Sequence, residues 1–300
     1  TILGAVLFLR FGYAVGTLGF WGCLIIILLG HSLTIPTALA LSELATNKRV
    51  EGGGEYFIIS RSFGLNIGAT IGMALYLSQA ISVAFYIIAF TESFEFIFNF
   101  FSESLNINLP RQIISIPVTI LLGFFILRKG ANFGVKALYI VAGIMLLVLL
   151  LFFFGRTDFQ TQDNTSIFSG ELRNMKDFFI VFAIVFPAFT GMTAGVGLSG
   201  DLKNPAKSIP LGTILATVTG MVVYLLVIYK LAISASPEDM LNNQLIMAKI
   251  AIGGAFFIPL GLAFSTISSA LGSMMVAPRT LQALAHDESF PSAKINKWLS

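Results

Sequence analysis

Apolar stretches long enough to cross a membrane recur along the whole chain, and they restrict its fold more than any other feature. An α-helix needs about 20 apolar residues to span a bilayer. Hydrophobic residues make up 56% of the 300 positions and charged residues 11%, and the mean hydropathy is +0.88. Because a soluble core of this length does not absorb so much apolar surface, we predict an all-α, multi-pass protein of the cell membrane. The expected spans lie near 1–17, 20–46, 65–97, 111–127, 132–155, 177–199, 209–234 and 252–278.

The charges between these spans predict their orientation. Loops on alternate sides differ in Lys and Arg content, and the richer side faces the cytoplasm by the positive-inside rule. The first and third spans therefore run outward, and the sixth runs inward. Since these charges do not form one stripe, we expect the lipid bilayer as surroundings and no nucleic-acid partner. The cytoplasmic side holds Lys48, Arg49, Arg61, Arg128, Lys129, Lys136, Lys203, Lys207 and Arg279.

Residues suited to catalysis or to metal binding are scarce. Cys23 is the only cysteine, and His31 and His286 stand far apart with no carboxylate at the spacing of metal ligands. An integral-membrane enzyme would need a nucleophile with a base, or a metal cluster, and neither is visible. We therefore expect no enzyme, no organic cofactor and no metal centre other than sites for alkali cations.

Two of the expected spans are interrupted in the middle. They carry "TILGAVLF" at 1–8 and "PAFTGMTAG" at 187–195, five spans apart, so they occupy corresponding positions if the chain consists of five-helix repeats. Pro187 removes an amide donor, and the glycines after it let the chain leave helical geometry. Freed carbonyls suit cations, and helix N-termini suit anions. Such paired interruptions predict a transporter's binding site, and a purely structural kink is the alternative.

Three serines in "AFSTISSALGS" form a second polar feature inside the membrane. Ser265, Ser268 and Ser269 follow the spacing i, i+3 and i+4, which places them on one face of the last span. Hydroxyl oxygens combined with freed carbonyls make a hard-oxygen site that suits a cation such as sodium. The alternative is ordinary packing of small residues between helices.

Two opposite charges are expected to meet near the outer side of the membrane. Arg10 follows Gly4 by six residues, and Glu92 follows Tyr86 by six, on two helices that both run outward. Six residues add about 9 Å of rise, so both charges share a level if Gly4 and Tyr86 do. Because unpaired charges at that depth are costly, Arg10 and Glu92 are candidates for an outer gate pair. A static salt bridge is the alternative.

Five stretches together resemble the cation-chloride cotransporter family, within the amino acid-polyamine-organocation superfamily. They are "GAVLFLRFGYAVG", "ATNKRVEGGGEYFIISRSFG", "SVAFYIIAFTES", "FPAFTGMTAGVGLSGDLKNPAKSIPLGT" and "STISSALGSMMVAPRTLQAL". The chain is similar to a prokaryote-like member of the sodium-potassium-chloride type. The resemblance implies a LeuT-like fold of inverted five-helix repeats with discontinuous helices one and six. It also implies secondary active cotransport of chloride with potassium, sodium or both, by alternating access.

The resemblance assigns a site to each ion by matching positions in the family's motifs. Thr1 stands where animal members commonly have asparagine, and Leu3 where sodium-coupled members have tryptophan, but backbone carbonyls tolerate both changes. The retained pair Ser268 and Ser269 favours a sodium-coupled member. The potassium site matches Thr1, Ile2, Tyr86, Pro187 and Thr190; chloride matches Gly4, Ala5 and Val6 and also Gly191, Met192 and Thr193; sodium matches Leu3, Ser265, Ser268 and Ser269.

The extent of the chain leads to further expectations. We expect one partial transport domain over 1–300, with a first repeat at about 1–155 and the start of a second at about 177–278, truncated after helix eight. Such a fragment is not expected to transport by itself, and the full-length protein is expected to form a homodimer. Two alternatives stay open, namely an amino acid permease of the same superfamily and a sodium-independent potassium-chloride cotransporter.

Overall fold

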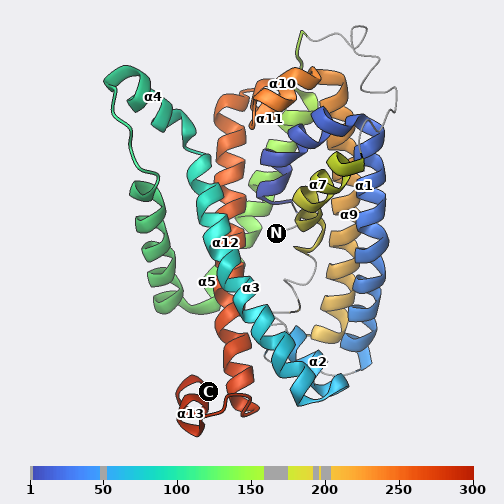
Figure 1. The fold of residues 1–300 in the computed structure, drawn as a ribbon, viewed down its shortest axis with the longest axis vertical. Coiled ribbons are helices and arrows are strands. Elements are labelled where there is room, and N and C mark those ends of the chain that lie inside the picture. The colour runs from blue at the N-terminus through green and yellow to red at the C-terminus, as the bar shows by residue number, and fades with distance from the viewer. Residues whose placement is uncertain (1–2, 48–52, 159–174, 192–195, 197–203) are drawn as a thin grey trace.

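The computed structural model describes residues 3–47, 53–158, 175–191, 196 and 204–300, and the regular structure in these residues is entirely helical (Figure 1). The long helices stand roughly upright in the view of Figure 1, with α2 at one end and α10 and α11 at the other. The helices are α1 (Ala5–Asn47), α2 (Glu55–Phe63), α3 (Leu65–Glu92), α4 (Glu95–Leu105), α5 (Gln112–Phe154), α7 (Met175–Val185), the 3-10 helix η2 (Phe186–Phe189), α9 (Pro205–Ser234), α10 (Pro237–Asn242), α11 (Ile246–Ile250), α12 (Gly254–His286) and α13 (Ala293–Leu299).

Helix α1 contains two of the predicted spans. Gly19 has φ 68° and ψ −176°, which is not helical, so two helices meet there. Glycine adopts this positive φ without the steric cost that a Cβ would bring. The first part rises from the N-terminus toward α10, and the second descends toward α2 (Figure 1). The predicted separation of the spans 1–17 and 20–46 is therefore confirmed.

Helix α5 also covers two predicted spans. Leu122 belongs to a small apolar cluster with Ala270 of α12, whereas Val148 lies where a side chain on Gly261 would be. A straight helix would place Leu122 and Val148 about 39 Å apart, while Gly261 and Ala270 are only about 14 Å apart along α12. Helix α5 must therefore turn back between these two contacts. Its two apolar parts are Gln112–Arg128 and Tyr139–Phe154.

The third, seventh and eighth spans are confirmed as helices, with corrected ends. The sixth, predicted at 177–199, is helical over 175–189, and 192–195 and 197–199 lie outside the described residues. The third span was predicted to continue to 97, but α3 ends at Glu92 and a turn leads into α4. The eighth was predicted to end near 278, but α12 continues to His286. Hydropathy locates the apolar part of a helix, whereas the ends here depend on charged side chains and on turns in the aqueous loops. Helices long and apolar enough to cross a membrane are Ala5–Leu44, Leu65–Glu92, Ala206–Ser234 and Gly254–His286.

The helices pack in two groups that meet at the centre of the protein. Helix α1 packs along α9, and α12 packs along α3 and α5. The main apolar core unites α1, α5, α7, α9 and α12 around fully buried side chains such as Phe8, Phe152 and Leu231. Large apolar residues such as Ile120 and Leu127 remain exposed, at 67% and 87%, on the outer faces of these helices. Exposed apolar faces on long helices are what a surrounding bilayer requires.

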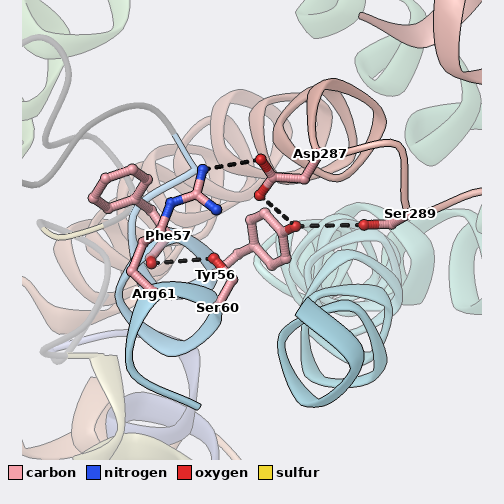
Figure 2. A network of polar contacts seen from close by, with 6 residues as sticks. All are labelled: Tyr56, Phe57, Ser60, Arg61, Asp287 and Ser289. Atoms are coloured by element: carbon pink, nitrogen blue, oxygen red, sulfur yellow. Dashed lines mark hydrogen bonds and ion pairs between the residues drawn. The ribbon is translucent and has the colours of Figure 1, made fainter. Parts of the chain in front are cut away.

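Helix α2 is joined to the end of α12 by a cluster of polar side chains (Figure 2). The phenol of Tyr56, a residue only 1% exposed, donates a hydrogen bond of 2.8 Å to Asp287 Oδ2. Arg61 Nη2 donates to the other oxygen, Asp287 Oδ1, at 2.9 Å. Burial raises the pKa of Tyr56, so its phenol stays protonated and able to donate. The stretch "EGGGEYFIISRSFG" thus contains a short helix with a fixed position against α12.

We expect Tyr56→Phe to lower the stability of the full-length protein, because Asp287 loses one donor at a buried site. The loss of one such hydrogen bond costs about 1–2 kcal/mol. The matched control is Tyr76→Phe on α3, whose hydroxyl has no hydrogen-bond partner among the described residues. The midpoint of thermal unfolding in detergent should fall for Tyr56→Phe only. Equal midpoints for the two variants would contradict the prediction.

Candidate functional site

A cavity of about 850 Å³ lies where α1, α3 and the end of α7 meet. Its wall contains residues from three distant parts of the sequence, and Arg10 lines it as well. A water molecule occupies about 30 Å³ in the liquid, so the cavity has room for ions together with many waters. The predicted site residues that it brings together are Gly4, Ala5, Val6, Tyr86, Pro187 and Thr190.

The helix that begins at Met175 is broken at the cavity wall. The α-helix ends at Val185, and Phe186–Phe189 form a 3-10 turn that contains Pro187. The Thr190 hydroxyl donates a hydrogen bond of 2.9 Å to the Pro187 carbonyl, and the Thr190 amide donates to the same oxygen at 3.4 Å. Two oxygens of different residues are therefore held close together on the cavity wall, which confirms the predicted interruption.

Tyr224 of α9 supports this break from behind. Its hydroxyl donates a hydrogen bond of 2.9 Å to the carbonyl of Ala188, which lies in the 3-10 turn. Tyr224 is completely buried, with its ring stacked on Phe11 at 4.9 Å between centroids and edge-on to Phe189 at 5.2 Å. The Phe189 ring in turn lies over Gly30, where any Cβ would collide with it. The broken segment is thus held in place by buried side chains of the core.

The sequence interpretation missed Tyr224. The only available signal was a tyrosine in the middle of the apolar span 209–234, and the interpretation gave it no role. A tyrosine that is buried in a membrane protein needs a hydrogen-bond partner, which is how this residue could have been recognised as a candidate support.

The start of α1 lies at the same cavity. Helix α1 begins at Ala5, and the first amides of an α-helix have no acceptor within the helix. The Gly4 carbonyl accepts from the Leu7 amide at 3.1 Å, which fixes the first turn. Gly4, Ala5 and Val6 all line the cavity, so this helix start, with its positive dipole end, faces the same space as Tyr86.

The three serines of α12 are buried, as expected for one face of a helix that packs inward. Ser265, Ser268 and Ser269 are 4%, 7% and 0% exposed. Ser265 donates to the Leu262 carbonyl at 3.1 Å, whereas Ser269 Oγ has no hydrogen-bond partner among the described residues. Tyr86 comes close enough to Ser269 to interact with it, although not in hydrogen-bond geometry. A buried hydroxyl without a partner is unusual and requires an explanation.

The cavity does not unite every predicted residue. Neither Leu3 nor the three serines are among its lining residues, and Leu3 packs instead against the main core. Gly191 follows Thr190 directly and is half-buried. Four predicted residues, Thr1, Ile2, Met192 and Thr193, lie outside the described residues.

Arg10 and Glu92 are neighbours that do not touch. Glu92 feels the positive charge of Arg10, but no ion pair within 4.0 Å joins them in the described part of the chain. Glu92 Oε1 lies 3.8 Å from Arg111 Nη1, and Glu92 Oε2 accepts a hydrogen bond of 3.2 Å from Gln244 Nε2. The sequence interpretation named neither Arg111 nor Gln244 as a partner.

Comparison with known proteins relates the chain to membrane transporters. The family model described as Amino acid permease matches residues 1–300. The chain is 32% identical to Solute carrier family 12 member 1 of Mus musculus, over 96% of this chain and 31% of that protein. It is 31% identical to Cation-chloride cotransporter 1 of Arabidopsis thaliana, over 97% of this chain and 34% of that protein.

A further relative, Cation-chloride cotransporter 2 of Oryza sativa subsp. japonica, is 29% identical over 97% of this chain and 34% of its own length. The chain therefore spans about a third of the length of the curated relatives it matches. These names describe transporters and not enzymes, which agrees with the expectation from the sequence. They also agree with the apolar helices, so the chain is a multi-pass membrane protein.

We expect Tyr224→Phe to destabilise the broken helix, because the buried Ala188 carbonyl would lose the hydrogen bond from Tyr224. The loss of one such buried hydrogen bond costs about 1–2 kcal/mol. Tyr229→Phe is the matched control, since Tyr229 lies on the same helix and is 51% exposed. Thermal unfolding of the full-length protein should separate the two variants, and a midpoint unchanged by Tyr224→Phe would refute the supporting role.

Proposed function

The chain belongs to the amino acid permease family, and from this premise we propose that the full-length protein is a secondary active cotransporter of chloride with potassium, sodium or both. The observation that carries the proposal is the shared cavity. Hydroxyl and carbonyl oxygens from α3 and the broken helix face the same space as the amide end of α1. Oxygens attract cations and a helix start attracts anions, so one cavity offers sites for both signs of charge.

The potassium ion would bind at the broken helix. The carbonyl oxygen of Pro187 and the hydroxyl oxygen of Thr190 are already held together by their 2.9 Å hydrogen bond. The Pro187 carbonyl already accepts from both the hydroxyl and the amide of Thr190. A potassium ion would therefore replace the hydroxyl's donor bond, after which the freed lone pair of Pro187 and the rotated hydroxyl oxygen of Thr190 could both face the cation. Tyr86 on the opposite wall would supply a further oxygen, and backbone oxygens of Thr1 and Ile2 would complete the site.

One chloride ion would bind at the amides of Gly4, Ala5 and Val6. The charge of Arg10, which lines the same cavity, favours anion entry from that side. A second chloride would bind at Gly191, Met192 and Thr193 after the break. The amino acid permease alternative places a substrate carboxylate on the same α1 amides. Tyr86 and Thr190 favour the ion, because they place oxygens where a substrate's amine would need room.

Sodium is proposed at Leu3, Ser265, Ser268 and Ser269. The buried Ser269 hydroxyl without a hydrogen-bond partner supports this assignment, because a bound cation would satisfy it. The alternative is a potassium-chloride cotransporter that is independent of sodium. In that case the Ser269 hydroxyl would only pack between helices and would bind no ion.

Transport would follow alternating access in a LeuT-like fold with repeats at about 1–155 and from about 177. The cavity would serve as the aqueous path to the ions, since its volume far exceeds that of one dehydrated ion. Arg10 and Glu92 would form the outer gate. We further propose that the full-length protein works in the bilayer as a homodimer.

The test is rubidium uptake into proteoliposomes that contain the full-length protein, with and without chloride and sodium. Uptake should require chloride. Tyr86→Phe should weaken rubidium affinity by about tenfold, because it removes one of the protein oxygens that would coordinate the charged ion. Ser269→Ala should abolish the stimulation by sodium, while the control Ser273→Ala, at another buried serine of α12, should retain it.

The outcomes separate the alternatives. Uptake that needs chloride but ignores both sodium and Ser269→Ala would move the protein to the sodium-independent type. Uptake of rubidium without any need for chloride, or no chloride-dependent uptake of either rubidium or sodium, would overturn the cotransporter proposal. Sodium-driven uptake of an amino acid in that case would favour the permease.

A further inference from the structure

Glu92, the last residue of α3, lies close to several charged side chains. Its side chain is 16% exposed, and one carboxylate oxygen lies 3.8 Å from Arg111, the residue just before α5. Arg111 lies equally far from Glu95, at the start of α4. Glu92 also experiences the positive charge of Arg10, which lines the cavity. Two arginines therefore attract the same carboxylate.

The contact with Arg111 is of a kind that exchanges easily. At 3.8 Å it is longer than a hydrogen bond, and the Arg111 side chain is 54% exposed. Exposed ion pairs of this length add little stability. If Glu92 turned to Arg10, Arg111 would still face Glu95, so the number of ion pairs would be conserved. The two arrangements therefore differ little in energy, which is what a switch requires.

Gln244 connects this carboxylate to the rest of the outer surface. Its amide donates to Glu92 Oε2 at 3.2 Å from the turn between α10 and α11. That segment packs closely on α1, since a Cβ at Gly12 would come 2.5 Å from Ile246 Cγ2. Gln244 is uncharged and donates to one oxygen of the Glu92 carboxylate. It can therefore keep this hydrogen bond whether Arg10 or Arg111 is the counter-ion of Glu92. The position of Glu92 therefore affects both α3 and α1.

We propose that Arg111 is a positioning residue of the outer gate, which competes with Arg10 for Glu92 and keeps the cavity open to the outside while it holds this carboxylate. Closure then requires Glu92 to move from Arg111 to Arg10. The inference rests on the gate role proposed above for Arg10 and Glu92, and it adds the partner that stabilises the open state.

The test measures access to the cavity and does not depend on ion transport. Ser82 lines the cavity and is half-buried, so Ser82→Cys is the reporter in full-length protein whose other cysteines are replaced. A membrane-impermeant methanethiosulfonate is applied from outside, and the rate of modification is measured. Arg10→Gln and Arg111→Gln are compared in this background. Both remove one positive charge near the mouth, so a purely electrostatic effect on the reagent would change both rates in the same direction.

We expect opposite effects from the two variants. Arg10→Gln should raise the modification rate by about threefold or more, and Arg111→Gln should lower it by a similar factor, because each removes the counter-ion of one state. Arg111→Lys should restore the original rate, which a general loss of folding would not allow. A rate that is unchanged or raised by Arg111→Gln, or changed in the same direction by both variants, would overturn the proposal. If rubidium uptake failed the test above while these rates separated, only the choice of ions would be wrong.

Discussion

The rest of the site depends on how the protein satisfies the backbone of a helix that breaks inside the membrane. Lipid offers no hydrogen bonds, so each carbonyl at the break around Pro187 needs a partner from the protein or from the cavity. The Ala188 carbonyl accepts from Tyr224, and the Pro187 carbonyl accepts from both the hydroxyl and the amide of Thr190 at the cavity wall. The bond from Tyr224 lies in the core, whereas the Thr190 hydroxyl at the cavity wall can rotate toward a ligand.

The bond from Tyr224 explains why an aromatic core lies directly behind the cavity. Tyr224, Phe11 and Phe189 pack rigidly against each other and against the space that Gly30 leaves. This aromatic packing restricts the broken segment to one geometry, and a preformed site loses less freedom when it binds a ligand. Helix α9 carries Tyr224 but has no residue among those that line the cavity. It would therefore affect the proposed ion binding indirectly, by supporting the broken segment.

The sequence predicted the elements well, because crossing a bilayer leaves a strong hydropathy signal and because proline and glycine mark the break at 187–195. It also placed Gly4, Tyr86 and Pro187 together, through motifs that resemble a known family. It did not find Tyr224, whose partner is a backbone carbonyl, or Arg111 and Gln244, whose contact with Glu92 joins residues far apart in the chain. Such contacts depend on how loops and helices pack, and neither periodicity nor composition records packing.

The two ends of the protein differ in the strength of their polar contacts. At the end that holds α2, both oxygens of Asp287 accept hydrogen bonds shorter than 3.0 Å, from the buried Tyr56 and from Arg61 (Figure 2). At the opposite end, Glu92 has a 3.8 Å ion pair with an exposed arginine and one longer hydrogen bond. Short bonds to a buried donor resist exchange, whereas loose exposed pairs permit it. The proposed gate therefore lies at the end of the protein whose charges are free to change partners, while the opposite end keeps α2 fixed to α12.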